Sequence, residues 1–247
     1  MDTVIKFILG FLLVIVIGFT ATFGYTSYVG HAYASSLTST YSYHCTITTD
    51  SVLTNVTFFI PVPVDPSGNS PVIAQISVKN IVGLPAGWQA TLYDTGKSTY
   101  VKLTTLSINS PAGTTADSPY AINISVDVSS SKLIDTISPI DHAAVYRPVQ
   151  DIHDVSCPAA TGDLSPAQHC FEYLTTTYAD YSATPNASVS ITSSVTGRNE
   201  WNIFKPEYNQ YSNRISLQMS GANHGWTITQ ASLEAGAGDN DAPTISA

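Results

Sequence analysis

The three cysteines of this 247-residue chain are the residues whose spacing points most directly to a specific chemistry, disulfide formation. Cys157 and Cys170 close a short, irregular, proline-containing loop, a spacing that suits a disulfide in an oxidising compartment. Such a bridge would stabilise the fold by about 3 kcal/mol. Cys45 alternates with apolar residues, so we expect a buried free thiol, although its pairing with either other cysteine is left open. A metal held by the loop cysteines with His153 and His169 is the weaker interpretation, because the chain has no CxxC-type pair.

The C-terminal segment is rich in the oxygen ligands that calcium prefers. Asp239, Asn240 and Asp241 lie together in the string GAGDNDAP, and Ca²⁺ takes about six to eight carboxylate, amide and carbonyl oxygens. They form a candidate calcium site, with a solvated tail as the alternative; no other cofactor is expected. A second group of carboxylates and imidazoles, which turn formation explains equally well, comprises Asp141, His142, Asp151, His153 and Asp154.

Three N-x-S/T sequons make Asn55, Asn123 and Asn186 candidate glycosylation sites. Their number alone carries no weight, because a chain so rich in Ser and Thr contains several by chance. Their positions carry more. Asn55 and Asn123 fall on the polar side of segments with alternating hydrophobicity, where a glycan has room. Glycosylation at these positions is therefore a prediction for an exported chain.

The chain shows none of the compact motifs that mark catalytic sites. It lacks a GxSxG elbow, an HExxH pair and a phosphate-binding GxxxxGK[ST] loop. A glycosidase needs two carboxylates that face each other across a cleft. Nothing in the sequence selects a pair from the glutamates, which are Glu172, Glu200, Glu207 and Glu234. We therefore predict a protein that is not an enzyme, with an unrecognised hydrolase as the alternative.

Tyrosine is the most abundant aromatic residue, with 14 copies. Tyr173, Tyr178 and Tyr181 lie in a region expected to be irregular, and Tyr208 and Tyr211 lie in an expected loop. Exposed tyrosines on loops bind sugars or protein partners. Tyrosines packed in a core serve as large amphipathic side chains. The second interpretation is the more general one, and the first is a hypothesis about binding.

An apolar N-terminal segment determines where these residues act. The string IKFILGFLLVIVIGFTATFGY lies near the N-terminus, and no Asp, Glu, Lys or Arg follows Lys6 until Asp50. About 20 apolar residues cross the hydrocarbon core of a bilayer. We therefore predict a transmembrane signal-anchor helix over residues 5–26, after a short cytoplasmic end at residues 1–4. The next basic residue is Lys79, so the positive-inside rule keeps the N-terminus in the cytoplasm and exports the rest.

Two other fates of this segment also place the rest of the chain outside the cell. Ala32-Tyr33-Ala34 is an A-x-A sequence of the kind that signal peptidase cuts, which would give a secreted protein, but it lies far beyond the most hydrophobic residues. A pilin-type subunit would bury the helix in a filament. Such precursors carry a basic-small cleavage pair followed by a glutamate, and this pattern is absent around Lys6 and Gly10. The uncleaved anchor is the leading prediction.

Hydrophobic and polar residues alternate over most of the chain after residue 40, which indicates strands with one buried face. Residues 72–78 show this period of two, and the DTGK string at residues 94–97 predicts a hairpin turn. Prolines interrupt the pattern over about residues 132–185. Within this insertion, Ser165-Pro166 predicts the start of a helix that runs to about Tyr178.

Antiparallel strands with one apolar face must bury that face against another layer. We therefore predict an all-β fold, an immunoglobulin-like antiparallel β-sandwich over residues 40–235. A stalk at residues 27–39 joins it to the helix, and a flexible acidic tail at residues 236–247 follows it. Two lobes divided near residues 130–185 are the alternative.

One region of the chain resembles known sequences. Between residues 41 and 106 the strings YSYHCTITTDSVLTNVTFFIPVPV, GLPAGW and LYDTGKSTYVKL resemble segments of uncharacterised exported and cell-surface proteins of methanogenic archaea. The resemblance covers about a quarter of the chain. It implies an archaeal cell-surface protein, and it brings no activity and no site residue with it.

Composition and placement together predict the class of function. The net charge of −9 repels phosphate backbones, which argues against nucleic acid as a partner. We predict a non-enzymatic, membrane-anchored cell-surface protein with a structural or adhesive ectodomain. Its expected partners are the lipid bilayer and envelope proteins, glycans or copies of itself. The alternatives are a subunit of an extracellular filament or envelope lattice, and a sugar-binding module or carbohydrate-active enzyme.

Overall fold

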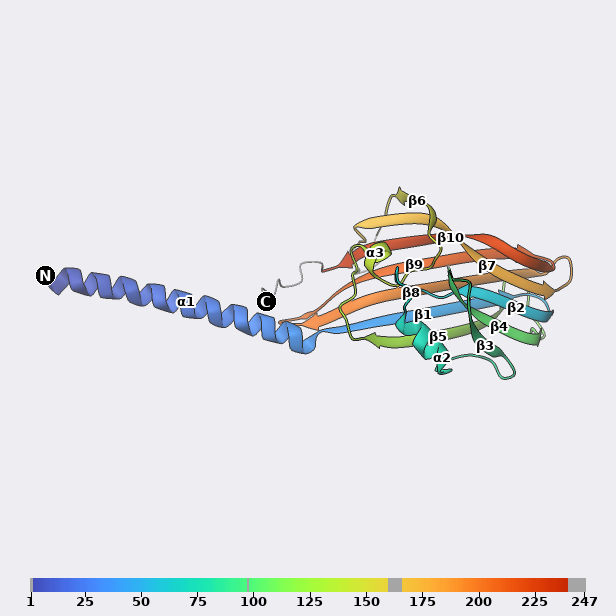
Figure 1. Cartoon of the computed structure of the whole chain (residues 1–247), viewed down its shortest axis with the longest axis horizontal. Helices are drawn as coiled ribbons and strands as arrows, with labels where there is room; N and C mark the ends of the chain where they lie inside the picture. Colours follow the sequence, from blue (N-terminus) through green and yellow to red (C-terminus); the bar gives the residue numbers. More distant parts are fainter. Residues whose placement is uncertain (1, 97, 160–165, 240–247) are drawn as a thin grey trace. The chain divides into compact units, whose positions relative to one another are not determined.

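The structure is a computed structural model of the whole chain, and it describes residues 2–96, 98–159 and 166–239 (Figure 1). The chain divides into two compact units. The first is built around the N-terminal helix and contains Met1–Leu37, Glu200–Glu207 and Asp241–Ala247. The second is built around a β-sheet and contains Thr38–Asn199 and Tyr208–Asn240.

The first unit contains helix α1 (Asp2–Ser36), which runs without interruption. Its stretch Ile5–Ser36 is long and apolar enough to cross a membrane, and protein buries none of its most apolar part. The hydroxyl of Thr22 donates to the carbonyl of Gly18 at 2.9 Å, which satisfies this polar group within the helix. The N-terminal apolar helix is therefore as predicted.

The predicted stalk at residues 27–39 is wrong. Helix α1 continues to Ser36, and strand β1 begins at Thr38. Alanine is the strongest helix former, and the helix that the apolar span forms extends through the alanines and serines that follow it. The chain therefore passes from helix to strand through a single residue, Leu37.

The β domain is a single, mostly antiparallel sheet of ten strands among the described residues. The strand order is β3-β4-β2-β7-β10-β9-β8-β1-β5, and β6 pairs with the part of β7 that β2 leaves free. The strands are β1 (Thr38–Thr49), β2 (Leu53–Pro61), β3 (Gln89–Asp94), β4 (Thr99–Ile108), β5 (Tyr120–Ser130), β6 (Gln150–Val155), β7 (His169–Ser182), β8 (Ser188–Asn202), β9 (Pro206–Ser220) and β10 (Asn223–Gly238).

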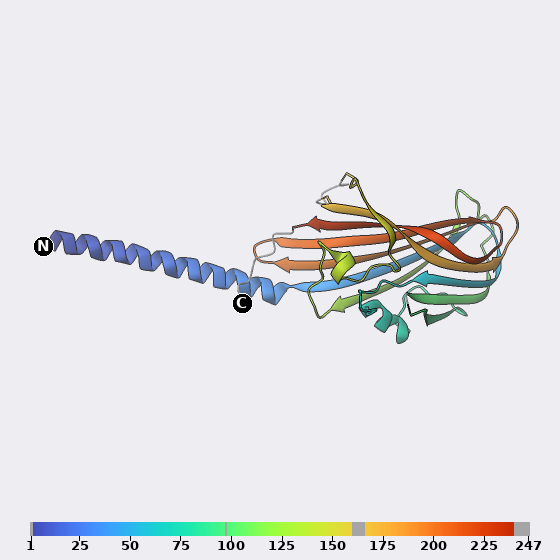
Figure 2. The same ribbon diagram turned by 45° about the horizontal axis from the view of Figure 1, so that its top comes forward.

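The sheet curls as a half-barrel, and the core fills its concave face (Figure 2). The inward side chains of the strands form one cluster, which includes Tyr43 and Ile47 of β1, Phe58 of β2 and Ile191 of β8. Helix α2 (Pro71–Ser77) contacts β3 near one end of the strand order and β5 at the other end. The helix therefore covers part of the open side of the half-barrel, and the convex face is left outermost.

Helix α2 corrects the strand predicted over residues 72–78. Ser70 caps the helix, because its hydroxyl accepts the backbone N–H of Val72 at 3.2 Å, and Pro71 occupies the first turn. Val72 and Ile76 are the buried residues. Their spacing of four residues fits one face of a helix as well as one face of a strand, so the alternation was ambiguous.

Residues 143–146 lie in the core on the concave side. Ala143, Ala144, Val145 and Tyr146 are all buried. The backbone N–H of Tyr146 donates to the side-chain oxygen of Asn213 at 2.8 Å, and the hydroxyl of Tyr173 donates to the carbonyl of Tyr146 at 2.9 Å. Side chains of the sheet thus satisfy backbone groups of a buried irregular segment, which would otherwise destabilise the core.

The helix predicted over residues 165–178 is wrong, since His169–Ser182 is strand β7. From Tyr173 to Tyr181 its inward residues alternate with outward residues at a strict period of two. This periodicity over nine residues outweighs the helix-start signal of Ser165-Pro166. The expected irregular insertion instead contains α3 (Pro139–His142), β6 and β7.

The all-β class with an N-terminal apolar helix is confirmed. The hairpin predicted around residues 94–97 is present as β3 and β4, which pair from Gln89 and Thr104 to Asp94 and Thr99. Strands before and after residues 130–185 belong to one sheet rather than to two lobes. The finer immunoglobulin-like assignment is not confirmed.

Candidate functional site

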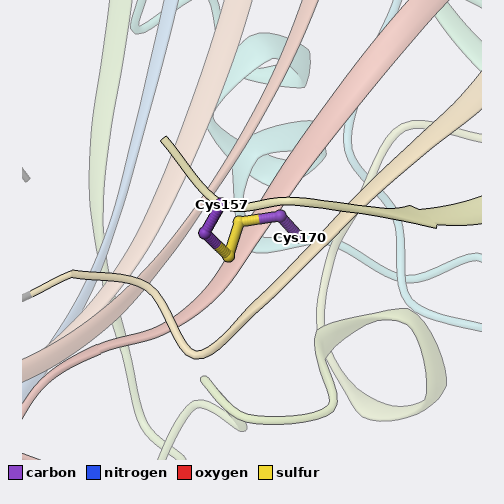
Figure 3. Close-up of a disulfide and its surroundings, with 2 residues drawn as sticks. All are labelled: Cys157 and Cys170. Carbon is purple, nitrogen blue, oxygen red and sulfur yellow. A yellow bond between two sulfur atoms is a disulfide. The ribbon is translucent and has the colours of Figure 1, made fainter. Parts of the chain in front are cut away.

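The predicted disulfide between Cys157 and Cys170 is present, with their Cα atoms 5.2 Å apart (Figure 3). It joins the chain after β6 to the start of β7, next to the paired residues Val155 and Cys170. Cys45 is free and buried, as predicted, and burial raises the pKa of its thiol to about 12. This thiol is therefore protonated and unreactive at neutral pH.

The metal site predicted from the loop cysteines is wrong, because both sulfurs are in the disulfide. His153 instead lies beside Glu172, with Nε2 and Oε2 3.6 Å apart. In the described parts of the chain, no three His, Cys, Asp or Glu side chains are grouped to hold a metal ion. This also removes the cluster considered at residues 141–154.

The predicted calcium ligands lie at the end of the described chain. The backbone N–H of Asp239 donates to the carbonyl of Tyr208 at 2.7 Å, just after β10 ends. Asn240 and Asp241 lie outside the described residues. The predicted tail begins too early, because residues 236–238 belong to β10, and its residues from Asn240 on lie outside the described residues.

All three sequon asparagines are exposed. Asn55 lies in β2 at an irregularity of the pairing with β7, with a positive φ of 55°. Asn123 lies in β5, and its side-chain oxygen accepts the hydroxyl of Thr46 at 2.9 Å. Asn186 lies in the turn before β8. Their side chains are thus accessible, and glycosylation stays a prediction.

An aromatic surface lies on the outer face of the sheet, opposite the core. We call it the aromatic face, and it consists of Phe59, Tyr93, Tyr100, Tyr178 and Trp226. The ring of Phe59 stacks on that of Tyr93 with centroids 4.8 Å apart, and it lies 4.9 Å from Tyr178. Trp226 contacts Tyr100 and Tyr178 at 5.1 and 5.3 Å. The rings therefore form one continuous group across β3, β4, β2, β7 and β10.

Strand register explains this arrangement. Phe58, Val101 and Ala179 point into the core, so the residues next to them in the sequence must point outward. The pairing then sets one outward residue of each strand side by side across the sheet: Lys102 of β4, Phe59 of β2, Tyr178 of β7 and Trp226 of β10. Such direct cross-strand neighbours are the closest side-chain pairs of a sheet.

Two rings of the aromatic face are open to solvent. Trp226 is 49 % exposed and Tyr93 is 44 % exposed, while Phe59 and Tyr178 are partly buried and Tyr100 is almost fully covered. The hydroxyl of Tyr100 lies 2.8 Å from that of Thr176, which holds this ring in place. A contiguous group of large rings with exposed members is a candidate site of interaction.

A polar row lies beside the aromatic face on the same side of the sheet, two residues away along β2, β7 and β10 and four residues away along β3 and β4. It consists of Gln89, Thr104, Thr57, Asp180 and His224, which are paired in that order across the same five strands. The carboxylate of Asp180 and Nδ1 of His224 are 2.6 Å apart, and the hydroxyl of Tyr178 donates to the other oxygen of Asp180 at 3.3 Å. Desolvation and the charge of Asp180 both raise the pKa of Tyr178.

A shallow hollow of about 320 Å³ adjoins the polar row. Thr57, Gln89 and Thr104 of that row line it, together with Asn55 and Leu106. The outer face of the sheet therefore carries amide, hydroxyl, carboxylate and imidazole groups beside flat apolar rings. This combination suits a ligand that has both apolar faces and many hydroxyls.

A second hollow of about 310 Å³ contains Asp65, Asp94 and Arg147. The carboxylate of Asp65 accepts the backbone N–H groups of Ser67 and Asn69, and that of Asp94 accepts the N–H of Gly96. The guanidinium of Arg147 donates to backbone carbonyls. These charged groups stabilise turns, so this hollow is the weaker candidate.

The tyrosines predicted to lie on binding loops lie on strands instead. Tyr173, Tyr181 and Tyr211 are buried, so the packing interpretation holds for them, and Tyr208 packs against the guanidinium of Arg198. Tyr178 alone joins the aromatic face. Sequence reasoning missed Phe59, Tyr93, Tyr100 and Trp226, although the alternation in each segment gave their outward direction.

Comparison with known proteins finds no match among protein-family models, curated proteins or solved structures.

Proposed function

We propose that this chain is a membrane-anchored cell-surface protein, archaeal by its resemblance, whose β domain is an adhesive module outside the cell. Two features support the placement. An apolar helix capable of spanning a bilayer precedes a domain that contains a disulfide, and disulfides persist in oxidising, extracytoplasmic compartments. Lys6 precedes the span, and the positive-inside rule then keeps the N-terminus in the cytoplasm.

We further propose that the aromatic face binds carbohydrate, and the observation that carries this is the aromatic group in register with a polar row. One face of a pyranose ring presents C–H groups, which pack on the exposed rings of Trp226 and Tyr93. Its hydroxyls then bond to side chains such as the carboxylate of Asp180, which accepts hydrogen bonds, and the imidazole of His224, whose other ring nitrogen can bond to a sugar hydroxyl. The protein acts as a binder and not as an enzyme.

The extent and charge of the surface narrow the class of sugar. From Tyr93 on β3 to Trp226 on β10 the group spans four strand spacings, or about 19 Å. A surface of this length fits an oligosaccharide better than a single sugar. The carboxylate of Asp180 and a net charge of −9 disfavour acidic sugars, so we propose a neutral polysaccharide.

Binding is tested with the full-length chain in nanodiscs, applied to a panel of neutral and acidic glycans. We expect retention on one class of neutral polysaccharide, and loss of retention for Trp226→Ala. Phe204→Ala is the matched control, because Phe204 is a more exposed aromatic residue outside the aromatic face. No binding to any glycan, or equal loss in both variants, would exclude the aromatic face as a sugar site.

Placement is tested with Leu106→Cys, an exposed position in the β domain. Cys45 is buried and the other cysteines are bonded, so the introduced thiol is the reactive one. A membrane-impermeant maleimide should label this variant in intact cells. Labelling only after the cells are lysed would contradict export.

A further inference from the structure

The end of helix α1 contacts a β-hairpin turn within the first unit. The ring of Phe204, in the turn between β8 and β9, lies 6.3 Å from that of Tyr25, with planes inclined by 13°, and 6.1 Å from that of Tyr28. We call these three residues the aromatic collar. The contact continues further along the helix, where the rings of Tyr33 and Trp201 meet edge to face at 5.6 Å.

Hydrogen bonds fix the turn to the helix. The backbone N–H of Asn202 donates to the hydroxyl oxygen of Ser36 at 2.9 Å, and this hydroxyl lies 3.2 Å from the carbonyl of Asn202. Within the turn, the indole N–H of Trp201 donates to the carboxylate of Glu207 at 2.8 Å. The position of Phe204 beside the helix is thus supported by polar contacts on the side away from the apolar span.

The rings of the collar pack on each other and yet stay open to their surroundings. Phe204 is 69 % exposed, Tyr25 is 60 % exposed and Tyr28 is 55 % exposed. A phenylalanine at the tip of a turn with this exposure loses its hydrophobic stabilisation unless something apolar covers it. The described residues leave most of the Phe204 ring uncovered, so the ring is available to an apolar partner.

The position of the collar along the helix identifies the apolar partner that covers these rings. Lys6 begins the apolar span, and Tyr25 lies 19 residues later, or about 28 Å along the helix axis. The hydrocarbon core of a bilayer is about 30 Å thick. If Lys6 lies at one interface, Tyr25 and Tyr28 lie at the other, where tyrosine rings are favoured.

We propose that the collar lies in the outer interfacial layer of the bilayer, with Phe204 inserted beside α1 as a second membrane contact. This rests on the proposed role of α1 as a membrane anchor. The collar is continuous with the apolar surface of α1. For this reason we assign lipid, rather than a separate protein, as the apolar partner that covers the collar. Lys205 follows Phe204 in the sequence, and its ammonium lies 3.6 Å from the carboxylate of Glu207 with a side chain 71 % exposed, so this polar pair fits the level of the lipid headgroups.

Fluorescent probes at single cysteines test this in the full-length chain, reconstituted in phosphatidylcholine vesicles. An NBD dye is attached in turn to Phe204→Cys, Val16→Cys and Leu106→Cys, and lipids carry a nitroxide quencher either at the headgroup or deep in the acyl chain. Val16 reports the span, and Leu106 is an exposed apolar residue of the β domain. We expect a blue-shifted emission at position 204 that the headgroup nitroxide quenches more than the deep one. Position 16 should show the reverse preference, and position 106 should show neither shift nor quenching.

Each other outcome has a defined meaning. Quenching at position 16 but not at 204 would refute the collar as a lipid contact and leave the anchor standing. A blue-shifted probe at 204 that neither lipid quenches would mean that protein covers the ring, which also refutes the lipid contact. Absence of quenching at position 16 by either lipid would refute the role of α1 as a membrane anchor.

Discussion

Phe59 of β2 and Tyr93 of β3 stack with ring planes inclined by 8°, although β4 lies between their two strands. The residue of β4 opposite Phe59 is Lys102, and its ammonium lies 5.6 Å from the centre of the Phe59 ring. The long side chains on the outer face therefore meet above β4 instead of lying apart on their own strands. A continuous surface results, and its uncovered sides are open to a ligand.

Truncation of this surface should weaken carbohydrate binding in proportion to ring exposure. Trp226→Ala should reduce affinity by about tenfold or more, because loss of a central aromatic contact costs about 1–2 kcal/mol. Tyr100→Phe should have little effect, because Tyr100 is almost fully covered and its hydroxyl bonds to Thr176. Titration of the full-length chain with the retained glycan measures both. Similar losses in the two variants would point to a general disturbance of the sheet.

Loss of the disulfide should lower stability without changing the fold. The double variant Cys157→Ser/Cys170→Ser should lose about 3 kcal/mol of unfolding free energy, because the closed segment of 13 residues gains freedom when unfolded. Denaturant titration followed by tryptophan fluorescence measures this loss. Reduction of the wild-type protein should give a similar decrease, whereas an unchanged midpoint in both experiments would contradict a stabilising role.

The sequence predicts local features such as a disulfide or a hairpin turn well, because residues close together in the chain determine them. The disulfide follows from the spacing of Cys157 and Cys170, and the hairpin of β3 and β4 follows from its turn residues. Short helices and strands are harder to predict from the sequence. Val72 and Ile76 satisfy the periods of both a strand and a helix, and only the capping of α2 by Ser70 decides between them.

The candidate site was not predictable from sequence in the same way. Phe59 and Trp226 lie near opposite ends of the chain, and they become neighbours only because β2 and β10 both pair with β7. That order depends on long-range strand pairing, which no local pattern encodes. The outward direction of each residue was available from alternation, but which outward residues share a patch was not.

Two buried tyrosines of β7 form a matched pair for testing the polar core. The hydroxyl of Tyr173 donates to the carbonyl of Tyr146 and to the side-chain oxygen of Asn213. Tyr173→Phe should therefore cost about 1–3 kcal/mol, because the buried carbonyl of Tyr146 loses this donor and Asn213 keeps only the backbone N–H of Tyr146 on its side-chain oxygen. The hydroxyl of Tyr181 has no hydrogen-bond partner among the described residues, so Tyr181→Phe should be neutral or stabilising.

Unfolding free energies of the two variants, measured by denaturant titration, check this contrast. Both rings are fully buried and point inward from the same strand, so the lost hydroxyl is the main difference between them. Equal costs in both variants would mean that ring packing and not hydrogen bonding sets the stability of this region.

Alkaline pH should unfold the β domain through its buried acids. Burial raises the pKa of Cys45 from 9.0 to about 12 and that of Tyr181 from 10.0 to about 12, and it raises the pKa values of Tyr43, Tyr146 and Tyr211 as well. Each group is neutral in both states below its unfolded pKa, so the free energy of unfolding should be constant below about pH 9. Above that pH the unfolded chain releases protons that the folded chain retains. Stability should then fall by up to about 1.4 kcal/mol per pH unit for each such group until the folded pKa is passed.

Denaturant titrations between pH 7 and about 11, with tyrosinate absorbance as a second signal, measure this decline. Conversion of all 14 tyrosines to tyrosinate without loss of folded structure would contradict the burial of these hydroxyls.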